Sequence, residues 1–120
     1  MPKVVHFEVM ADNPESILSF YSDVFGWKSN KWDGPMDYWL IDTGEGPGIG
    51  GGIARKQEGG PGVINTIDVE SVDSYTEKVQ SAGGQVAMPK MAVPGVGWMA
   101  YCTDPEGNLF GIMEEDTSAA

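Results

Sequence analysis

VVHFEVMADNPESILSFYSDVFGW, residues 4–27, decides the fold because it holds a strand, a capped helix and the start of a second strand. Apolar residues alternate over 4–10, as in a strand with one buried face. Asn13 and Pro14 form a typical helix start, with Asn as the N-cap and Pro at the first helical position. Gly26 should end the helix. The residues expected to form an apolar stripe against a sheet are Ile17, Phe20, Tyr21, Val24 and Phe25.

The second half of the chain repeats this order of parts in GVINTIDVESVDSYTEKVQSAGGQV, residues 62–86. Ser71 is the N-cap of its helix, and Gly84 lies 58 residues after Gly26, which is nearly half of the 120 residues. Few residues are identical, so the pattern is what repeats. The repeat predicts two similar modules, and it allows each candidate site residue to be compared with its counterpart.

Short apolar segments supply the other strands of both modules. They cover 27–32, 36–41, the surroundings of Ile53, 63–69, the surroundings of Val86, 98–103 and 109–114. A loop is expected over 88–97 and a frayed tail over 116–120. We therefore predict one α+β domain over 1–120, with two tandem βαβββ modules at about 1–57 and 62–115 and a linker at about 57–62. The strands should form a curved mixed sheet around a pocket, with the helices outside.

The composition excludes several classes of partner. The formal net charge of −11 disfavours nucleic acid, whose phosphates require clustered Lys and Arg. No apolar run approaches the length that spans a membrane, and the N-terminus lacks a signal-peptide pattern. Cys102 is the only cysteine, so an internal disulfide is impossible. We expect a cytoplasmic protein.

His6 is the only histidine, and it shares one face of the first strand with Glu8. If that face is concave, the imidazole and the carboxylate make a modest metal or acid–base pair. The alternative, a histidine with an ordinary structural role, stays open. We take His6 and Glu8 as the candidate catalytic residues.

Aromatic and methionine side chains are abundant, and core packing explains most of them. Those expected to line a pocket for an apolar ligand are Trp39, Trp98, Tyr101 and Met113. The glycine run at 46–51 fits the G-x-G-x-x-G spacing, but too little chain follows it for the helix that would hold a dinucleotide. The run is better explained as a loop at the edge of a pocket.

Several motifs, in order along the chain, resemble the vicinal oxygen chelate (VOC) superfamily of glyoxalases, bleomycin resistance proteins and extradiol dioxygenases. They are HFEV at 6–9, NPE at 13–15, FYSDVFGW at 20–27, DVESVD at 68–73 and DPEGN at 104–108. The resemblance implies paired βαβββ modules, commonly in a homodimer. It also implies a divalent metal held by one residue from each of four strands.

The metal positions that the resemblance implies are mostly occupied by residues without donors. His6 fits the first position, but its repeat partner is Ile64. The last position, three residues after the Asn of DPEGN, is Gly111, and its partner lies at about Ile53. Divalent metals require three or four protein donors. We therefore expect no usual metal site and no cofactor.

The function expected from this pattern is that of a glyoxalase/bleomycin-resistance-like protein that binds or transforms a small organic molecule without the usual metal. One alternative is a metal-dependent lyase or dioxygenase, with ligands supplied across a dimer interface or by Glu8. The other is a non-catalytic protein that sequesters a drug or carries a metabolite.

Overall fold

The structure, a computed structural model, describes residues 1–34 and 36–120. The chain forms two compact units. The N-terminal unit is His6–Ile64, and the C-terminal unit combines Met1–Val5 with Asn65–Ala120. The first residues of the chain thus belong to the unit built mainly from its second half.

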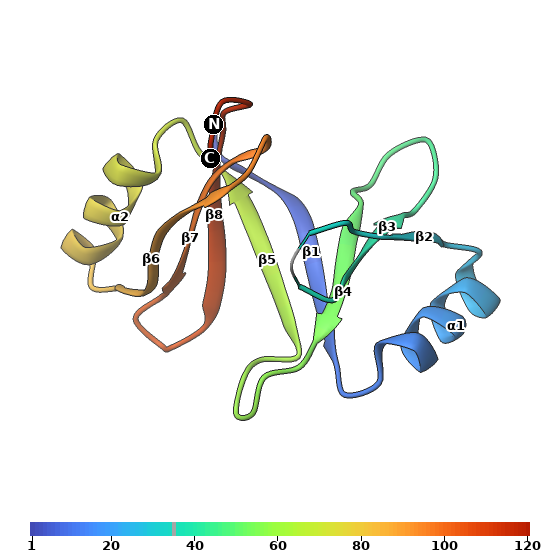
Figure 1. The fold of residues 1–120 in the computed structure, drawn as a ribbon. Coiled ribbons are helices and arrows are strands. Elements are labelled where there is room, and N and C mark those ends of the chain that lie inside the picture. The colour runs from blue at the N-terminus through green and yellow to red at the C-terminus, as the bar shows by residue number, and fades with distance from the viewer. Residues whose placement is uncertain (35) are drawn as a thin grey trace. The chain divides into compact units, whose positions relative to one another are not determined.

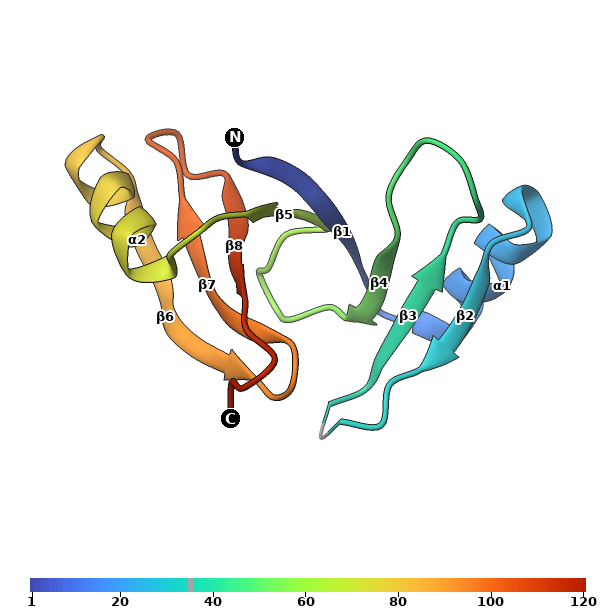
Figure 2. The same cartoon turned by 90° about the horizontal axis from the view of Figure 1, so that it is seen from above.

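The N-terminal unit is built on a βαβββ module (Figure 1). The elements of this module are β1 (Lys3–Ala11), which enters the unit at His6, α1 (Pro14–Phe25), β2 (Lys28–Lys31), β3 (Tyr38–Asp42) and β4 (Gly51–Arg55). Strand β1 pairs in parallel with β4, and β4 and β2 both pair antiparallel with β3. The strand order is therefore β2-β3-β4-β1, as Figure 2 shows from above.

Helix α1 begins and ends where the sequence predicts. The Asn13 side chain accepts a hydrogen bond from the Ser16 backbone N–H at 3.2 Å, and Pro14 occupies the first turn. Gly26 has φ 74° and donates its N–H to the Ser22 carbonyl at 2.9 Å. This left-handed conformation suits glycine because it has no Cβ.

The predicted apolar stripe of α1 is only partly right. Ile17, Leu18 and Tyr21 pack on the core residues of the sheet, which are Ala11, Ile41 and Ile53. In contrast, Phe20, Val24 and Phe25 are 53%, 55% and 61% exposed. The buried face is centred on Ile17 and Tyr21, so residues further around the helix lie outside it. Tyr21 stacks on Trp27, with ring centroids 4.9 Å apart.

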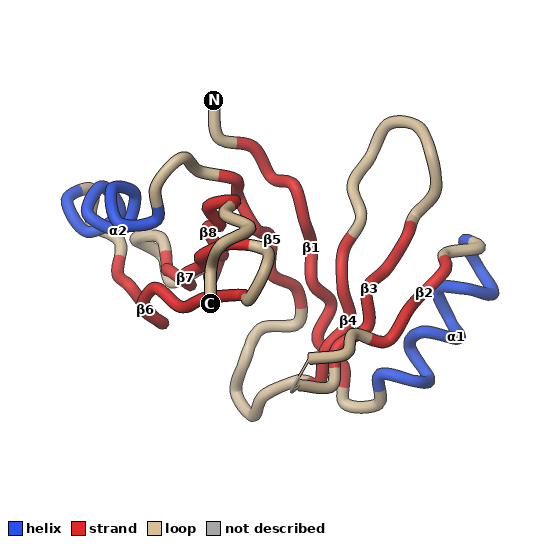
Figure 3. Tube along the Cα trace, turned by 45° about the horizontal axis from the view of Figure 1, so that its top comes forward, coloured by secondary structure: helices blue, strands red, loops and turns tan. Residues whose placement is uncertain are grey.

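The C-terminal unit is built on the second βαβββ module. Its elements are β5 (Val63–Asp68), α2 (Val72–Ser81), β6 (Gln85–Val93), β7 (Gly97–Thr103) and β8 (Leu109–Glu115). Strand β5 pairs in parallel with β8, and the antiparallel pairs β8–β7 and β7–β6 complete the order β5-β8-β7-β6 (Figure 3). The core lies between these strands and α2 and includes Val72, Ala100, Cys102 and Ile112.

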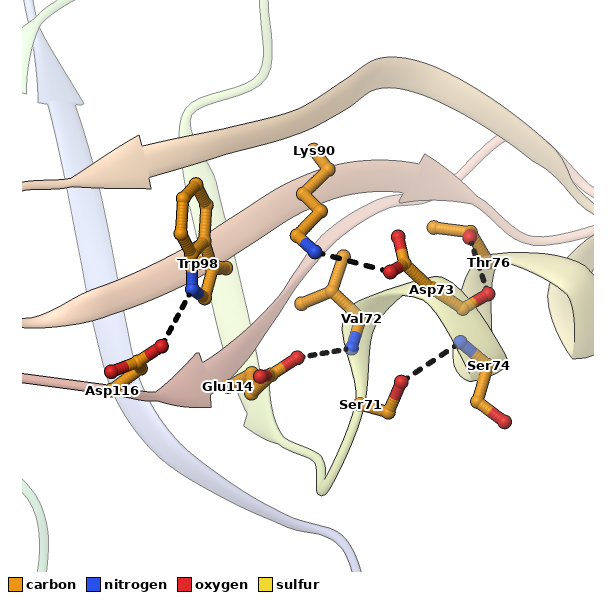
Figure 4. A network of polar contacts seen from close by, with 9 residues as sticks. All are labelled: Ser71, Val72, Asp73, Ser74, Thr76, Lys90, Trp98, Glu114 and Asp116. Atoms are coloured by element: carbon orange, nitrogen blue, oxygen red, sulfur yellow. Dashed lines mark hydrogen bonds and ion pairs between the residues drawn. The ribbon is translucent and has the colours of Figure 1, made fainter. Parts of the chain in front are cut away.

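Polar contacts fix the start of α2 (Figure 4). The Ser71 hydroxyl accepts a hydrogen bond from the Ser74 backbone N–H at 3.1 Å, as expected of an N-cap. The Glu114 carboxylate, on β8, accepts a hydrogen bond from the Val72 N–H at 3.0 Å. Since the first N–H groups of a helix lack partners within it, Glu114 satisfies one of them and ties α2 to the sheet.

Two expectations for the C-terminal unit are wrong. Most of the predicted loop at 88–97 belongs to β6, which is an edge strand with register shifts and therefore tolerates Pro89. The tail is not frayed, since Gly95 donates its N–H to the Ala119 carbonyl at 3.0 Å and the Asp116 N–H bonds the Val96 carbonyl at the same distance.

The predicted α+β class with two βαβββ modules and a mixed pattern of strand pairing is confirmed. Residues 57–62, the expected linker, lie between β4 and β5. Among the described residues, no helix has the length and apolar character needed to cross a membrane.

Candidate functional site

His6 and Glu8 lie on the face of the N-terminal sheet that points away from α1. Strand pairing aligns Glu8 with Gly52 and Gly52 with Leu40, so these residues share a face. The alternate residues, Val9 and Ile53, pack with the core under α1. We call this side the polar face, and its members are His6, Glu8, Met10, Tyr38, Leu40, Gly52 and Ala54.

The central contact of the polar face joins His6 to Tyr38. The His6 Nε2 atom lies 2.7 Å from the Tyr38 hydroxyl oxygen, which is a hydrogen-bonding distance. The two ring planes differ by only 16°, with centroids 6.5 Å apart. A neutral imidazole that carries its proton on Nδ1 accepts at Nε2, and the tyrosine hydroxyl then donates to it.

The charge state of His6 follows from its surroundings. Burial lowers the pKa of His6 below its usual value, while the nearby Glu8 carboxylate opposes that shift. Glu8 is itself only 7% exposed. At neutral pH the imidazole is therefore uncharged and can accept a hydrogen bond or a proton. A tyrosine, a neutral histidine and a carboxylate on one face are groups that suit acid–base or hydrogen-bonding chemistry.

The structure places Tyr38 on the polar face, where Trp39 was expected. Trp39 pairs with Ile53 and so lies on the side of α1, where the Lys31 ammonium group is 5.7 Å from its ring centroid. Tyr38 and Leu40, the residues on either side of Trp39, lie on the polar face. The strand was predicted without its register, and a shift of one residue reverses which side chains face the site.

In the C-terminal unit, Tyr101 and Met113 lie on the face away from α2. Tyr101 pairs with Gly111, and Gly111 pairs with Thr66. Trp98 lies on the opposite face, where it packs against the core, and its indole N–H bonds Asp116 Oδ2 at 2.9 Å (Figure 4). The structure therefore brings Tyr101 and Met113 to one face and places Trp98 on the other.

Strand register corrects the internal alignment of the two modules. Gly52 pairs in parallel with Glu8, and Gly111 pairs in parallel with Thr66, so Gly111 corresponds to Gly52 rather than to Ile53. Both positions carry glycine, which has no side-chain donor. Among the described residues, no group of three or more His, Cys, Asp or Glu side chains has an arrangement that could hold a metal ion. The donors within each unit do not fit a four-ligand site.

Two surface hollows lie elsewhere, in the C-terminal unit. One has a volume of about 490 Å³, and its walls include Asp68, Glu70 and Tyr75. The other, about 400 Å³, runs along α2 beside Glu77 and Lys78. Neither is lined by residues of the polar face.

Comparison with known proteins identifies the family. The family described as the glyoxalase/bleomycin resistance protein/dioxygenase superfamily matches residues 3–112, most of the chain. The chain belongs to this superfamily. The resemblance seen in the sequence motifs is thereby confirmed.

Two curated relatives are similar to this chain over most of its length. "Putative glyoxylase CFP32" of Mycobacterium bovis is 27% identical over 110 residues, which cover 89% of this chain and 42% of that protein. The anthracycline biosynthesis protein DnrV of Streptomyces peucetius is 27% identical over 122 residues, covering 88% of this chain and 44% of that protein. The chain thus spans less than half the length of these relatives.

A solved structure agrees with the fold. Methylmalonyl-CoA epimerase from Mycobacterium tuberculosis has a TM-score of 0.72 at 14% identity, with 94% of this chain and 87% of that chain covered. At this identity the likeness concerns the fold alone.

Proposed function

We propose that this VOC protein binds a small, uncharged, oxygen-bearing organic molecule at the polar face, through the His6–Tyr38 pair and without the four-ligand metal of the superfamily. The observation that carries the proposal is the 2.7 Å contact between His6 Nε2 and the Tyr38 hydroxyl, beside the buried Glu8. The contact lies on the polar face, where strand β4 carries Gly52, a residue without a side-chain donor for a metal ion.

The chemistry of these groups supports the ligand class. Tyr38 can donate its hydroxyl proton or accept at its oxygen, and an uncharged His6 adds no positive charge that would attract an anion. The Glu8 carboxylate disfavours a negatively charged ligand, as does the net charge of −11. Leu40, 45% exposed on the same face, provides apolar surface for the rest of the molecule.

The names of two relatives are consistent with small organic ligands, but the two names point to different classes of compound. One is named as a putative glyoxylase and another as an anthracycline biosynthesis protein. The Tyr38 phenol and the His6 imidazole can exchange hydrogen bonds with hydroxyl and carbonyl groups, so an oxygenated aromatic compound is a suitable probe. A cytoplasmic location and a homodimer stay predictions.

The test uses a neutral probe and two charged or reactive ones. The purified protein is titrated with 1,8-dihydroxyanthraquinone, with methylmalonyl-CoA and with the hemithioacetal of methylglyoxal and glutathione, and turnover of each is followed. We expect saturable binding of the anthraquinone, none of the CoA ester and no glyoxalase turnover. Rapid conversion of the hemithioacetal would contradict the proposal and favour the metal-dependent lyase.

Native mass spectrometry of the freshly purified protein gives a second, independent readout. A retained organic molecule without a carboxylate or phosphate supports the proposal. A retained divalent cation in equimolar amount contradicts it.

A further inference from the structure

Gly52 lies directly beneath the Tyr38 ring on the polar face. A Cβ atom built on Gly52 would overlap Tyr38 at its hydroxyl and at Cζ, and would come within 2.7 Å of Cε1. Real side chains do not approach this closely, so the Tyr38 ring occupies the space that any residue other than glycine would need. Gly52 is buried and Tyr38 is half-buried, so a side chain at position 52 would have to displace the end of the Tyr38 side chain.

The C-terminal unit contains the same arrangement in a looser form. A Cβ on Gly111 would lie 3.0 Å from Thr66 Oγ1 and 3.4 Å from Tyr101 Cε1. Gly111 corresponds to Gly52 in the strand register, and in both units a tyrosine of the adjacent strand covers the glycine. The overlap is severe at Gly52 and mild at Gly111, which makes the second position a natural control.

We propose that Gly52 is a positioning residue of the site: by leaving its side-chain space empty it admits the Tyr38 ring, whose hydroxyl then donates to His6 Nε2 and presents its oxygen to the ligand. The inference rests on the proposed function for the ligand, but not for the geometry. The direction of the hydrogen bond follows from chemistry, since a phenol is the stronger donor and an imidazole nitrogen the stronger acceptor.

The consequence for His6 is that its Nε2 lone pair is engaged by an O–H group. A ligand therefore meets the tyrosine oxygen, while His6 acts behind it by holding the hydroxyl in place. Molecules that bind through a hydroxyl or carbonyl group fit this arrangement, because such groups exchange hydrogen bonds with a phenol.

The single histidine makes the inference directly measurable by ¹⁵N NMR of the imidazole nitrogens. In the native protein at pH 7.5 we expect the tautomer with the proton on Nδ1, since Tyr38 donates to Nε2. Tyr38→Phe removes only the hydroxyl, and Gly52→Ala displaces the ring. Both variants should shift the His6 tautomer toward the form with the proton on Nε2, although neither Gly nor Ala at position 52 has a side-chain donor or acceptor for His6.

Gly111→Ala is the matched control and should leave the His6 resonances unchanged. A dispersed amide spectrum establishes that each variant is folded. If Gly52→Ala does not fold, Tyr38→Phe still tests whether the Tyr38 hydroxyl donates to His6 Nε2. Native protein with the proton on Nε2, or a tautomer unaffected by Tyr38→Phe, overturns the inference.

Ligand-binding measurements on the same variants separate this inference from the proposed function. Tyr38→Phe and Gly52→Ala should each raise the Kd for 1,8-dihydroxyanthraquinone by about 3- to 10-fold, the loss of one hydrogen bond, whereas Gly111→Ala should not. If the native protein does not bind the probe, the proposed function fails, and the His6 spectrum still decides the role of Gly52. Unchanged affinity in Tyr38→Phe contradicts the contact between Tyr38 and the ligand.

Discussion

The Trp98 indole N–H donates to the Asp116 carboxylate at 2.9 Å, and this contact ties the C-terminal tail to β7. The tail is held further by the hydrogen bond from Gly95 to the Ala119 carbonyl, and Ala119 is only 4% exposed. A segment that looks like a frayed end in the sequence therefore belongs to the folded unit.

This contact predicts a pH dependence of the tail. Hydrogen bonds from Ser118 and Trp98 lower the pKa of Asp116 below its usual value of 3.8. Because the folded pKa is the lower one, the stabilisation is present above the unfolded pKa and is lost as the pH falls through the folded pKa. The Trp98 indole resonance should shift with a midpoint below 3.8. In Asp116→Asn the shift should be absent; a midpoint above 3.8 in the native protein would refute the assignment.

The hydrogen bond from the Val72 N–H to the Glu114 carboxylate should contribute measurably to the stability of the C-terminal unit. Glu114→Ala removes the acceptor for the Val72 N–H and should lower the free energy of unfolding by about 0.5–2 kcal/mol, as for other caps. Urea unfolding measures the difference. Glu115→Ala, at an exposed neighbouring position, is the control and should change stability by less than about 0.5 kcal/mol. Equal losses in both variants would argue against the capping role.

Truncation of Ile53 should cause the largest loss of stability in the N-terminal unit. It is fully buried between the sheet and α1, so Ile53→Ala should cost about 2–5 kcal/mol through lost burial and a cavity. Ile49→Ala, in the glycine-rich loop at 36% exposure, should cost far less. Thermal and urea unfolding of the two variants check the contrast, and similar losses would show that the described core is incorrect.

Cys102 should be unreactive in the folded protein. The residue is 0% exposed, and burial raises the pKa of its thiol, so little thiolate is present at neutral pH. Ellman's reagent should label it only after unfolding in guanidinium chloride. Complete labelling within minutes under native conditions would contradict its place in the core.

Local signals predicted the elements of the fold, whereas the residues of the site required strand register. Asn13, Gly26 and Ser71 mark helix ends through interactions with near neighbours, and such signals can be read from a sequence. Whether Tyr38 or Trp39 faces the site depends on pairing with a strand more than ten residues away, and the alternation of the segment alone does not decide it.

The same limit applies to β6 and to the site glycines. Pro89 argues against a strand locally, but an edge strand does not require every N–H. A glycine in a strand signals a bulge or a close approach without naming the neighbour, so the Tyr38 ring over Gly52 became apparent only in three dimensions. His6 and Glu8 were recognised because they share a strand, and alternation alone places them on one face.

The chemistry of the polar face depends most on whether His6 serves an organic ligand or a metal ion. Isothermal titration calorimetry of the chelator-treated protein with Ni²⁺ and Zn²⁺, alongside His6→Ala, tests it most directly. We predict no one-to-one binding tighter than about 0.1 mM, because His6 and Glu8 alone fall short of the three or four donors that a useful site needs. Tight equimolar binding that disappears in His6→Ala would contradict the account and restore the metal-dependent chemistry of the superfamily.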